Sequence, residues 1–446
     1  MRRLLIVLTA LLLLVVAAVP GVSAKAAGPK PDYFLDESKL PFDPLPGLSA
    51  SQYWGVHGGA GYRVEVPDNW NGDLVVWAHG FRGDGLELTV DNHPLRPLLL
   101  QLGYAWAASS YSTNSYDVAQ GVKDTHALTK LFNGLVGNPD ITYLTGASMG
   151  GHITAAAIEQ YPRSYDGAMP ICGVLGDYEL FDFFVDFSLV AQTLTGVTSP
   201  YPFPADYGTA YVSAIKADLE LFPGTFPFTL NEHGEHLKSF TELATGGDRP
   251  VFDQGFLFWN GVVPGDFLFG VLAGADGTMP RSPGQIIDNT DTVYQFDTDP
   301  NLTPAEQLVN DEILRVAADP SGRHPNGLAN APIVSGDIGI PVLTLHTLGD
   351  LFVPFSMEQI YADRVAHHGA SDLLVQRAIR DVGHCAFTGD EQAAGFLDLV
   401  TWVEQGSRPA GDDVSDPTAV SDPNFGCFFT SEDRSYPGPL AIPACP

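Results

Sequence analysis

The stretch of sequence that decides the fold runs from residue 143 to residue 162 and reads YLTGASMGGHITAAAIEQYP. A short apolar run leads into Gly146-Ala147-Ser148-Met149-Gly150, and an alanine-rich helical pattern follows and stops near Pro162. A serine between glycines is common in ordinary tight turns. Between a buried strand and a helix, the same pattern predicts a serine that projects above the sheet as a nucleophile. Such a hydroxyl needs a base beside it and an acid that orients the base.

The segments on both sides of this stretch alternate between strand and helix patterns. Strands are predicted in YRVEVP, DLVVWAHGF, GYAWAASSY, DITYLTGAS, YDGAMPICGV, IPVLTLHTLGDLFVP and DLLVQRAIRDVGHC. Helices are predicted in VKDTHALTKLFNGL, GGHITAAAIEQYP, FSMEQIYADRVAHHG and GDEQAAGFLDLVTWVEQG. This alternation predicts an α/β fold with right-handed crossovers and a mostly parallel central sheet.

The alternation is interrupted by a long segment that is rich in Phe, Pro, Gly and Asp, which we interpret as a mainly helical cap inserted into the core. The expected organisation is a signal peptide at 1–24, a leader at 25–60, the first part of the core at 61–178, the cap at 179–335, the second part of the core at 336–408 and a tail at 409–446. The aromatic residues of the cap are more typical of an ordinary hydrophobic core than of a substrate pocket, which is the alternative, and they carry no readable motif.

The first 24 residues have the order of a secretory signal. Arg2 and Arg3 precede an apolar run over residues 4–19, and Val22-Ser23-Ala24 forms a small-residue cleavage site. The apolar run is short for a membrane span. We therefore expect cleavage after Ala24, an exported protein and no stable membrane insertion of the mature chain.

The formal net charge of the chain is −31, and the sequence pI is near 4.4. A surface this acidic repels nucleic acid and anionic lipid, so neither is an expected partner. The charge is compatible with salt tolerance or simply with the solubility of an exported protein.

If Ser148 is a nucleophile, an acid should follow a later strand and a histidine should follow the last strand. Asp350 comes directly after the strand in TLHTLGDLFVP, and His384 lies in the loop after the final strand, in RDVGHCAF. Two other acids compete for the role of the acid. Asp177 also follows a strand end, and Asp381 lies three residues before the histidine.

An acyl-transfer site also needs donors for an oxyanion. The amide of Met149 directly follows the nucleophile, and the His79-Gly80-Phe81 turn after an early strand offers the amide of Phe81, with Arg82 as the alternative. We expect His79 itself to be a packed structural residue. The same holds for His152, which lies one helical turn beyond the serine.

These motifs together resemble the α/β-hydrolase superfamily over residues 61–178 and 336–408. The resemblance implies an eight-stranded type of sheet flanked by helices, with a cap over the site. The GASMGG form resembles that of secreted esterases, including feruloyl- and polyester-type hydrolases, and that of some serine peptidases.

The four cysteines fit this resemblance in part. An even number in an exported protein suggests disulfides. Four cysteines permit three pairings, of which we favour Cys427–Cys445, clipping the tail, and Cys172–Cys385. Cys385 directly after the histidine is similar to tannase and fungal feruloyl esterases, where a disulfide ties the nucleophile to the histidine. Here Ala147 stands where those enzymes have a cysteine before the serine, and a Cys172–Cys385 bond would instead fasten the histidine loop to the strand after the nucleophile helix. The alternative is two buried free thiols.

The expected protein is a secreted serine hydrolase that cleaves carboxylic esters through an acyl-enzyme, with no metal or organic cofactor. Ser148 attacks, His384 transfers the proton, and Asp350 holds the imidazole. A serine peptidase or amidase of the same superfamily is the alternative, and a non-catalytic binding protein on this scaffold is a further one. The sequence does not name the substrate, which is expected to be a small-molecule or polymeric ester.

Overall fold

The structure is a computed structural model that describes residues 31–221, 226–277, 284–323, 331–431, 434 and 436–446. The expected signal peptide therefore lies outside the described residues. Within the described ranges, no helix has the length and apolar character needed to cross a membrane.

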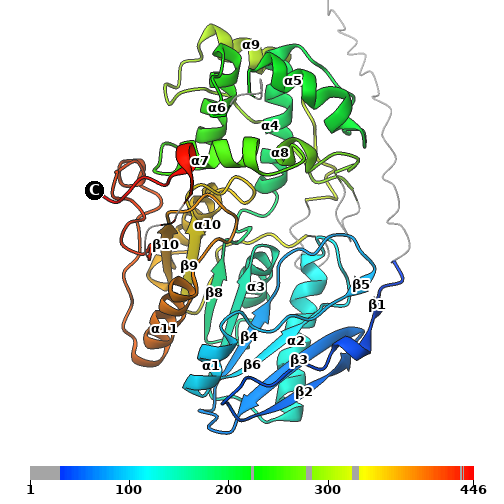
Figure 1. Cartoon of the computed structure of the whole chain (residues 1–446), viewed down its shortest axis with the longest axis vertical. Helices are drawn as coiled ribbons and strands as arrows, with labels where there is room; N and C mark the ends of the chain where they lie inside the picture. Colours follow the sequence, from blue (N-terminus) through cyan, green and yellow to red (C-terminus); the bar gives the residue numbers. More distant parts are fainter. Residues whose placement is uncertain (1–30, 222–225, 278–283, 324–330, 432–433, 435) are drawn as a thin grey trace, which may run out of the picture.

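Eight strands form the central sheet in the order β10-β9-β8-β7-β4-β6-β3-β2 (Figure 1). The six strands from β10 to β6 in this order are mutually parallel, whereas β3 is antiparallel to both β6 and β2. The strands are β2 (Ala50–His57), β3 (Ala60–Pro67), β4 (Leu74–Ala78), β6 (Ala105–Ser109), β7 (Thr142–Ala147), β8 (Gly167–Ile171), β9 (Val342–Thr347) and β10 (Leu374–Ile379). The carboxyl ends of β4, β7, β8, β9 and β10 consequently meet at one edge of the sheet.

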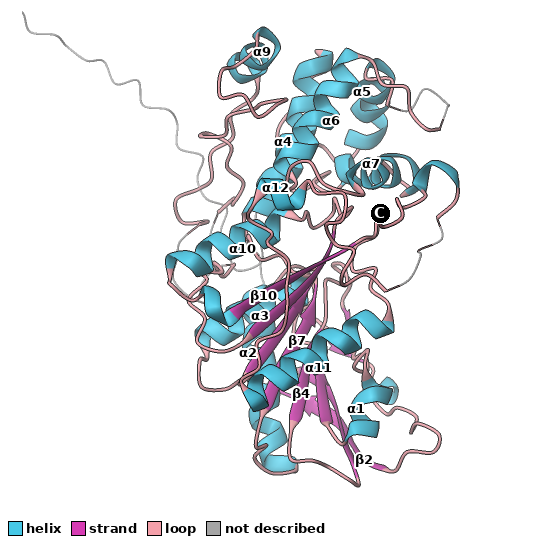
Figure 2. Ribbon diagram, turned by 90° about the vertical axis from the view of Figure 1, so that its left-hand side faces the viewer, coloured by secondary structure: helices cyan, strands magenta, loops and turns pink. Residues whose placement is uncertain are grey.

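Helices cover both faces of this sheet (Figure 2). One face carries α2 (Val118–Leu135), α3 (Met149–Gln160) and α10 (Ser356–His367), and the other carries α1 (Arg96–Leu102) and α11 (Gly389–Gln405). Side chains of β4 alternate between the two cores: Val76 belongs to the core with Ile153 of α3, and Val75 to the core with Leu99 of α1. Burial on both faces explains the continuous apolar run of β4.

The segment between β8 and β9 is mainly helical and lies beyond the carboxyl ends of the strands (Figure 1). Its elements are α4 (Glu179–Thr195), the π-helical turn η2 (Gly208–Val212), α5 (Ser213–Asp218), α6 (Glu232–Ala244), α7 (Phe252–Leu257), the π-helical turn η3 (Phe258–Val262), α8 (Phe267–Gly270) and α9 (Pro304–Glu312). Short elements complete the chain: β1 (Phe34–Leu35), β5 (Glu87–Leu88), α12 (Pro417–Val420), and 3₁₀ turns at Glu37–Lys39, Ser371–Leu373 and Gly438–Leu440. The helical insert is referred to below as the cap.

The predicted α/β fold with its mostly parallel sheet is confirmed. One strand of the central sheet was not predicted: residues 50–57, which we expected to belong to a leader, form the edge strand β2. Most of its residues are exposed or half-buried, so the segment lacks the apolar alternation that marks a strand in sequence. The remaining boundaries of the leader, core, cap and tail stay predictions.

The turn from β7 into α3 requires a glycine at position 150. A Cβ atom there would lie 2.0 Å from the carbonyl oxygen of Ala78, at the end of β4. We therefore expect Gly150→Ala to lower the free energy of unfolding by about 3 kcal/mol, because the clash is with backbone that cannot rotate away. Chemical denaturation followed by circular dichroism measures this change.

Gly134→Ala is the matched control. Gly134 lies in α2, and no atom would lie within 4 Å of a Cβ atom there. This substitution should stabilise the protein by about 0.5–1 kcal/mol, since alanine loses less entropy in a helix. Equal effects of the two substitutions would contradict the packing described for Gly150.

Candidate active site

Ser148 occupies the turn between β7 and α3 and has a backbone φ of 59° and ψ of −122°. Non-glycine residues rarely adopt a positive φ, and the strain costs about 1–3 kcal/mol. The glycines around the serine allow the turn, because a Cβ atom on Gly146 would lie 2.3 Å from the carbonyl oxygen of Gly150. The hydroxyl makes no capping hydrogen bond to α3, so it is free to face the histidine.

His384 lies between Ser148 and Asp350. Its Nε2 is 2.8 Å from the serine Oγ, and its Nδ1 is 2.6 Å from Oδ2 of Asp350. A carboxylate only accepts hydrogen bonds, so Nδ1 carries the proton and the neutral ring accepts from the serine hydroxyl at Nε2. This is the arrangement in which an imidazole can take the serine proton during attack.

Asp350 is fully buried in the turn after β9, and its other carboxylate oxygen, Oδ1, also accepts hydrogen bonds. Oδ1 accepts the backbone N–H groups of Phe352 at 2.9 Å and Val353 at 3.1 Å. These two bonds fix the carboxylate plane and leave Oδ2 for the histidine. We call residues 348–353 the acid turn and residues 380–388 the histidine loop.

The two competing acids are held elsewhere. Asp177 accepts hydrogen bonds from Arg364 at 2.6 Å and from the amide of Val334 at 3.0 Å. Asp381 accepts from Arg434 at 2.6 Å and from the hydroxyl of Tyr436 at 2.8 Å. The structure therefore brings Asp350 to the histidine and engages both other carboxylates in structural contacts.

The His79-Gly80-Phe81 turn lies against the serine. A Cβ atom on Gly80 would be 3.2 Å from the Ser148 Cβ and 3.7 Å from its Oγ. Met149 is the first residue of α3, so its amide has no acceptor within the helix. The amides of Met149 and Phe81 thus lie in the two backbone segments that border the hydroxyl. The guanidinium of Arg82 is directed away, to Asp91 and Thr89.

His79 and His152 are packed residues, as their surroundings show. His79 stacks on Tyr111 with ring centroids 4.0 Å apart, and burial lowers its pKa to about 3. His152 contacts the carbonyl of Pro332 through Nε2 and the hydroxyl of Tyr116 through Nδ1, and burial lowers its pKa to about 4. Both rings are neutral at physiological pH.

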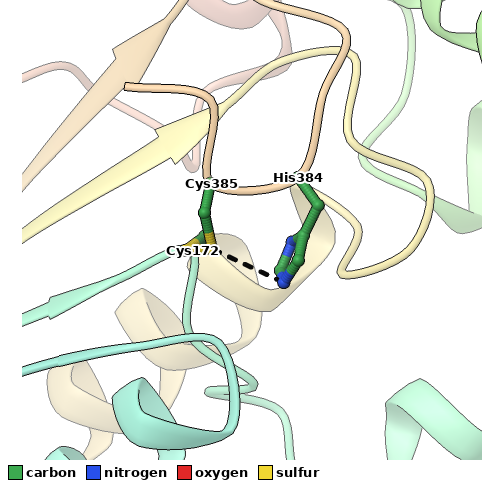
Figure 3. Close-up of side chains that lie close together, drawn as sticks. All are labelled: Cys172, His384 and Cys385. Atoms are coloured by element: carbon green, nitrogen blue, oxygen red, sulfur yellow. Dashed lines mark hydrogen bonds between the residues drawn. A yellow bond between two sulfur atoms is a disulfide. The ribbon is translucent and has the colours of Figure 1, made fainter. Parts of the chain in front are cut away.

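A disulfide joins Cys172, directly after β8, to Cys385 in the histidine loop (Figure 3). The Sγ of Cys385 lies 3.5 Å from Nε2 of His384. These two sulfurs and the imidazole have the spacing of a metal cluster, but both sulfurs are bonded to each other, so neither is a thiolate ligand. The second disulfide joins Cys427 to Cys445 within the tail.

Two cap residues not singled out in the sequence contact the loops around the histidine. Nε1 of Trp259 donates to the carbonyl of Gly349 at 3.0 Å and to that of Val382 at 2.9 Å, which links the acid turn to the histidine loop. Arg249 is buried, and its Nε donates to the carbonyl of Leu348 at 2.8 Å. Burial lowers the pKa of Arg249 to about 10, so it stays charged at neutral pH. No local sequence pattern marks either residue.

Removal of the Cys172–Cys385 disulfide should reduce turnover. In the double variant Cys172→Ala/Cys385→Ala the histidine loop loses its covalent tie to β8, and a shift of about 1 Å in a reacting group lowers the rate about a hundredfold. The measurement is kcat with a chromogenic ester, at a temperature where circular dichroism shows a folded protein.

The matched control is Cys427→Ala/Cys445→Ala, which removes the tail disulfide and leaves the histidine loop intact. This variant should keep its kcat within about twofold, because the tail bond does not contact His384. A comparable loss of kcat in both variants would contradict the positioning role of the first disulfide.

Trp259→Phe should lower kcat about tenfold with little change in KM, because it removes the indole N–H that joins the carbonyl of Gly349 in the acid turn to that of Val382 in the histidine loop. Trp70→Phe is the control, since Nε1 of Trp70 also donates to a backbone carbonyl, that of Asp73, at 2.8 Å. Both variants should lose about 1 kcal/mol of stability. Only the first should lose activity.

No protein-family model matches the chain. An o-phthalyl amidase from Xanthobacter agilis is 22% identical over 408 aligned residues, covering 79% of this chain and 87% of the relative. Feruloyl esterase B from Aspergillus oryzae superposes with a TM-score of 0.43 at 15% identity, covering 86% of each chain. The tannin acyl hydrolase from Aspergillus niger superposes with a TM-score of 0.42 at 13% identity, covering 84% of this chain and 87% of its own.

These similarities are remote, so the description of the fold rests on the structure itself. The eight-stranded sheet has an antiparallel edge and parallel crossovers, and a strand–turn–helix elbow presents Ser148 at the carboxyl edge. The sheet order and the strand–turn–helix elbow are those of the α/β-hydrolase fold.

Proposed function

We propose that the protein is a serine hydrolase that cleaves carboxylic esters through an acyl-enzyme intermediate. The observation that carries the proposal is the continuous chain from Ser148 Oγ through His384 to Asp350, at 2.8 and 2.6 Å. A neutral imidazole at this distance takes the proton as the serine attacks a carbonyl carbon, and the same imidazole later protonates the leaving group.

The tetrahedral intermediate carries a negative oxygen that must be stabilised. We assign this role to the amides of Met149 and Phe81, supported by the approach of the Gly80 backbone to the serine. The N-terminus of α3, which begins at Met149, adds the favourable end of its dipole. Water activated by His384 then attacks the acyl-enzyme and releases Ser148. These steps require no metal or organic cofactor.

An amidase is the second candidate, and the observation that favours it is the 22% identity with an o-phthalyl amidase over most of both chains. Esters and amides share the same nucleophilic steps. They differ in the leaving group, since an amine must be protonated before it departs. A non-catalytic binding protein is less well supported, because such a scaffold has no need for an aligned serine, histidine and acid.

We also propose that the protein is exported. Its two disulfides form in an oxidising compartment such as the periplasm or the extracellular space. The N-terminal sequence has the order of a cleavable signal.

Ser148→Ala should lower kcat/KM for 4-nitrophenyl acetate at least about 10⁴-fold while leaving the unfolding transition unchanged. A fluorophosphonate probe should label the parent protein and not this variant. Ser51→Ala, at an exposed position of β2, serves as the control and should retain full labelling and rate. Labelling of the Ser148→Ala protein at the parental level would overturn the assignment.

Paired substrates with one acyl group decide between the two candidate activities. The 4-nitrophenyl ester should turn over, and the matching 4-nitroanilide should be cleaved at least about a hundredfold more slowly, because protonation of the departing amine limits amide cleavage. A higher kcat/KM for the anilide would overturn the esterase proposal in favour of the amidase.

A further inference from the structure

A cavity of about 210 Å³ opens against Ser148, between the carboxyl edge of the sheet and the cap. Most of the described residues that line it are apolar, and several come from cap helix α4 or the loops that follow α8. The apolar lining residues include Leu180, Phe181, Phe184, Leu272, Ile287 and, from the acid turn, Phe352. The cavity is therefore formed jointly by the core and the cap, beside the candidate nucleophile.

Aromatic rings form one continuous wall of this cavity. Phe181 packs edge-on against Tyr116 with centroids 5.2 Å apart, and it also contacts Phe184 at 6.3 Å. Phe184 stacks on Phe352 of the acid turn at 6.0 Å, and Phe352 lies edge-on to the ring of His384 at 5.1 Å. Aromatic pairs prefer these offset and edge-to-face geometries, so the wall offers the same contacts to a bound ring.

The polar groups of the cavity do not favour a charged ligand. Among its described lining residues there is one carboxylate, Asp84, which is exposed, and there is no lysine, arginine or histidine. The hydroxyl of Tyr116 is already bonded to Nδ1 of His152 at 3.0 Å. A carboxylate placed here would lose its hydration without gaining a described cation as a partner.

The volume restricts the size of the ligand. An apolar cavity of about 150 Å³ lined by Leu, Ile and Phe binds benzene. The cavity beside Ser148 is somewhat larger, at about 210 Å³. It therefore has room for a single ring with a small substituent, and a long acyl chain would exceed it.

The position of His384 indicates which side of the scissile bond occupies the cavity. The leaving group takes its proton from Nε2 of His384 and so must lie on the histidine side of Ser148. Ser148 borders the cavity, whereas His384 is not among the described residues that line it. The cavity thus lies on the acyl side of the carbonyl carbon.

We propose that this cavity is the acyl pocket and that it selects a compact, uncharged aromatic acyl group. The proposal rests on the serine esterase function proposed above, because it assigns a substrate class to the same site. Edge-on and stacked contacts with the aromatic wall would orient the ring of the acyl group, and the volume of the cavity would limit its length.

Esters with one leaving group and different acyl groups test this directly. With 4-nitrophenyl esters, kcat/KM should be at least about tenfold higher for 4-methylbenzoate than for laurate, because the long chain does not fit. It should be at least about a hundredfold higher for 4-methylbenzoate than for 4-carboxybenzoate, which is similar in size but charged. Equal or greater activity on 4-carboxybenzoate or laurate would overturn the proposal.

Two neighbouring phenylalanines of α4 provide a matched pair of variants. Phe184 lines the cavity, whereas Phe183, which is also buried, lines a different cavity that Ser148 does not border. Phe184→Ala should raise the laurate-to-benzoate ratio of kcat/KM about tenfold by enlarging the pocket, and Phe183→Ala should leave the ratio unchanged. Similar ratios in both variants would contradict the assignment.

A final series of esters tests whether the cavity binds the acyl group or the alcohol group of the substrate. Benzoate esters of 4-nitrophenol, phenol and ethanol vary only the leaving group, and Phe184→Ala should not change their relative kcat/KM values. A change confined to this series would assign the cavity to the alcohol and overturn the proposal. Loss of all Ser148-dependent turnover, by contrast, would count against the hydrolase itself. If cleavage of acetate esters depends on Ser148 but the protein shows no preference among acyl groups, only the acyl-pocket proposal is overturned.

Discussion

The turn at Ser148 holds a non-glycine residue at a φ of 59°, and the surrounding packing has to keep it there. β7 is paired on both sides, with β4 and β8, and the amide of Ser148 donates to the carbonyl of Ile171 at 3.0 Å. On the other side of the turn, α3 approaches the end of β4 so closely that only glycine fits at position 150. A strained serine is thereby fixed at the edge where the parallel strands end.

The imidazole of His384 depends on supports from three separate parts of the chain. Asp350 fixes its tautomer, the Cys172–Cys385 disulfide ties its loop to β8, and Trp259 of the cap bridges the loop to the acid turn. Through Trp259, the cap also supports the backbone beside the acid and the histidine. Any movement of η3 would be transmitted to the backbone beside the acid and the histidine, because one indole N–H contacts both.

The predictable part of the site consists of residues whose position follows from the ends of strands. Ser148, Asp350 and His384 each follow a buried strand of the sheet, and the carboxyl ends of parallel strands share one edge. The structure separates Asp350 from its competitors Asp177 and Asp381, because each competing carboxylate accepts a hydrogen bond from an arginine. The edge strand β2 was missed because its exposed residues do not alternate.

The sequence by itself determined the fold class and predicted the chain order of a candidate nucleophile, acid and base, because apolar runs and glycine turns are local signals that need no partner to be read. Only the tertiary structure decided how the cap meets the site. Trp259, Arg249 and the rings of Phe181 and Phe184 reach the acid turn, the histidine loop or the serine cavity through contacts between segments far apart in the chain. In sequence they look like any buried aromatic or cation, since a side chain's partner across the fold leaves no periodic trace in its own neighbourhood.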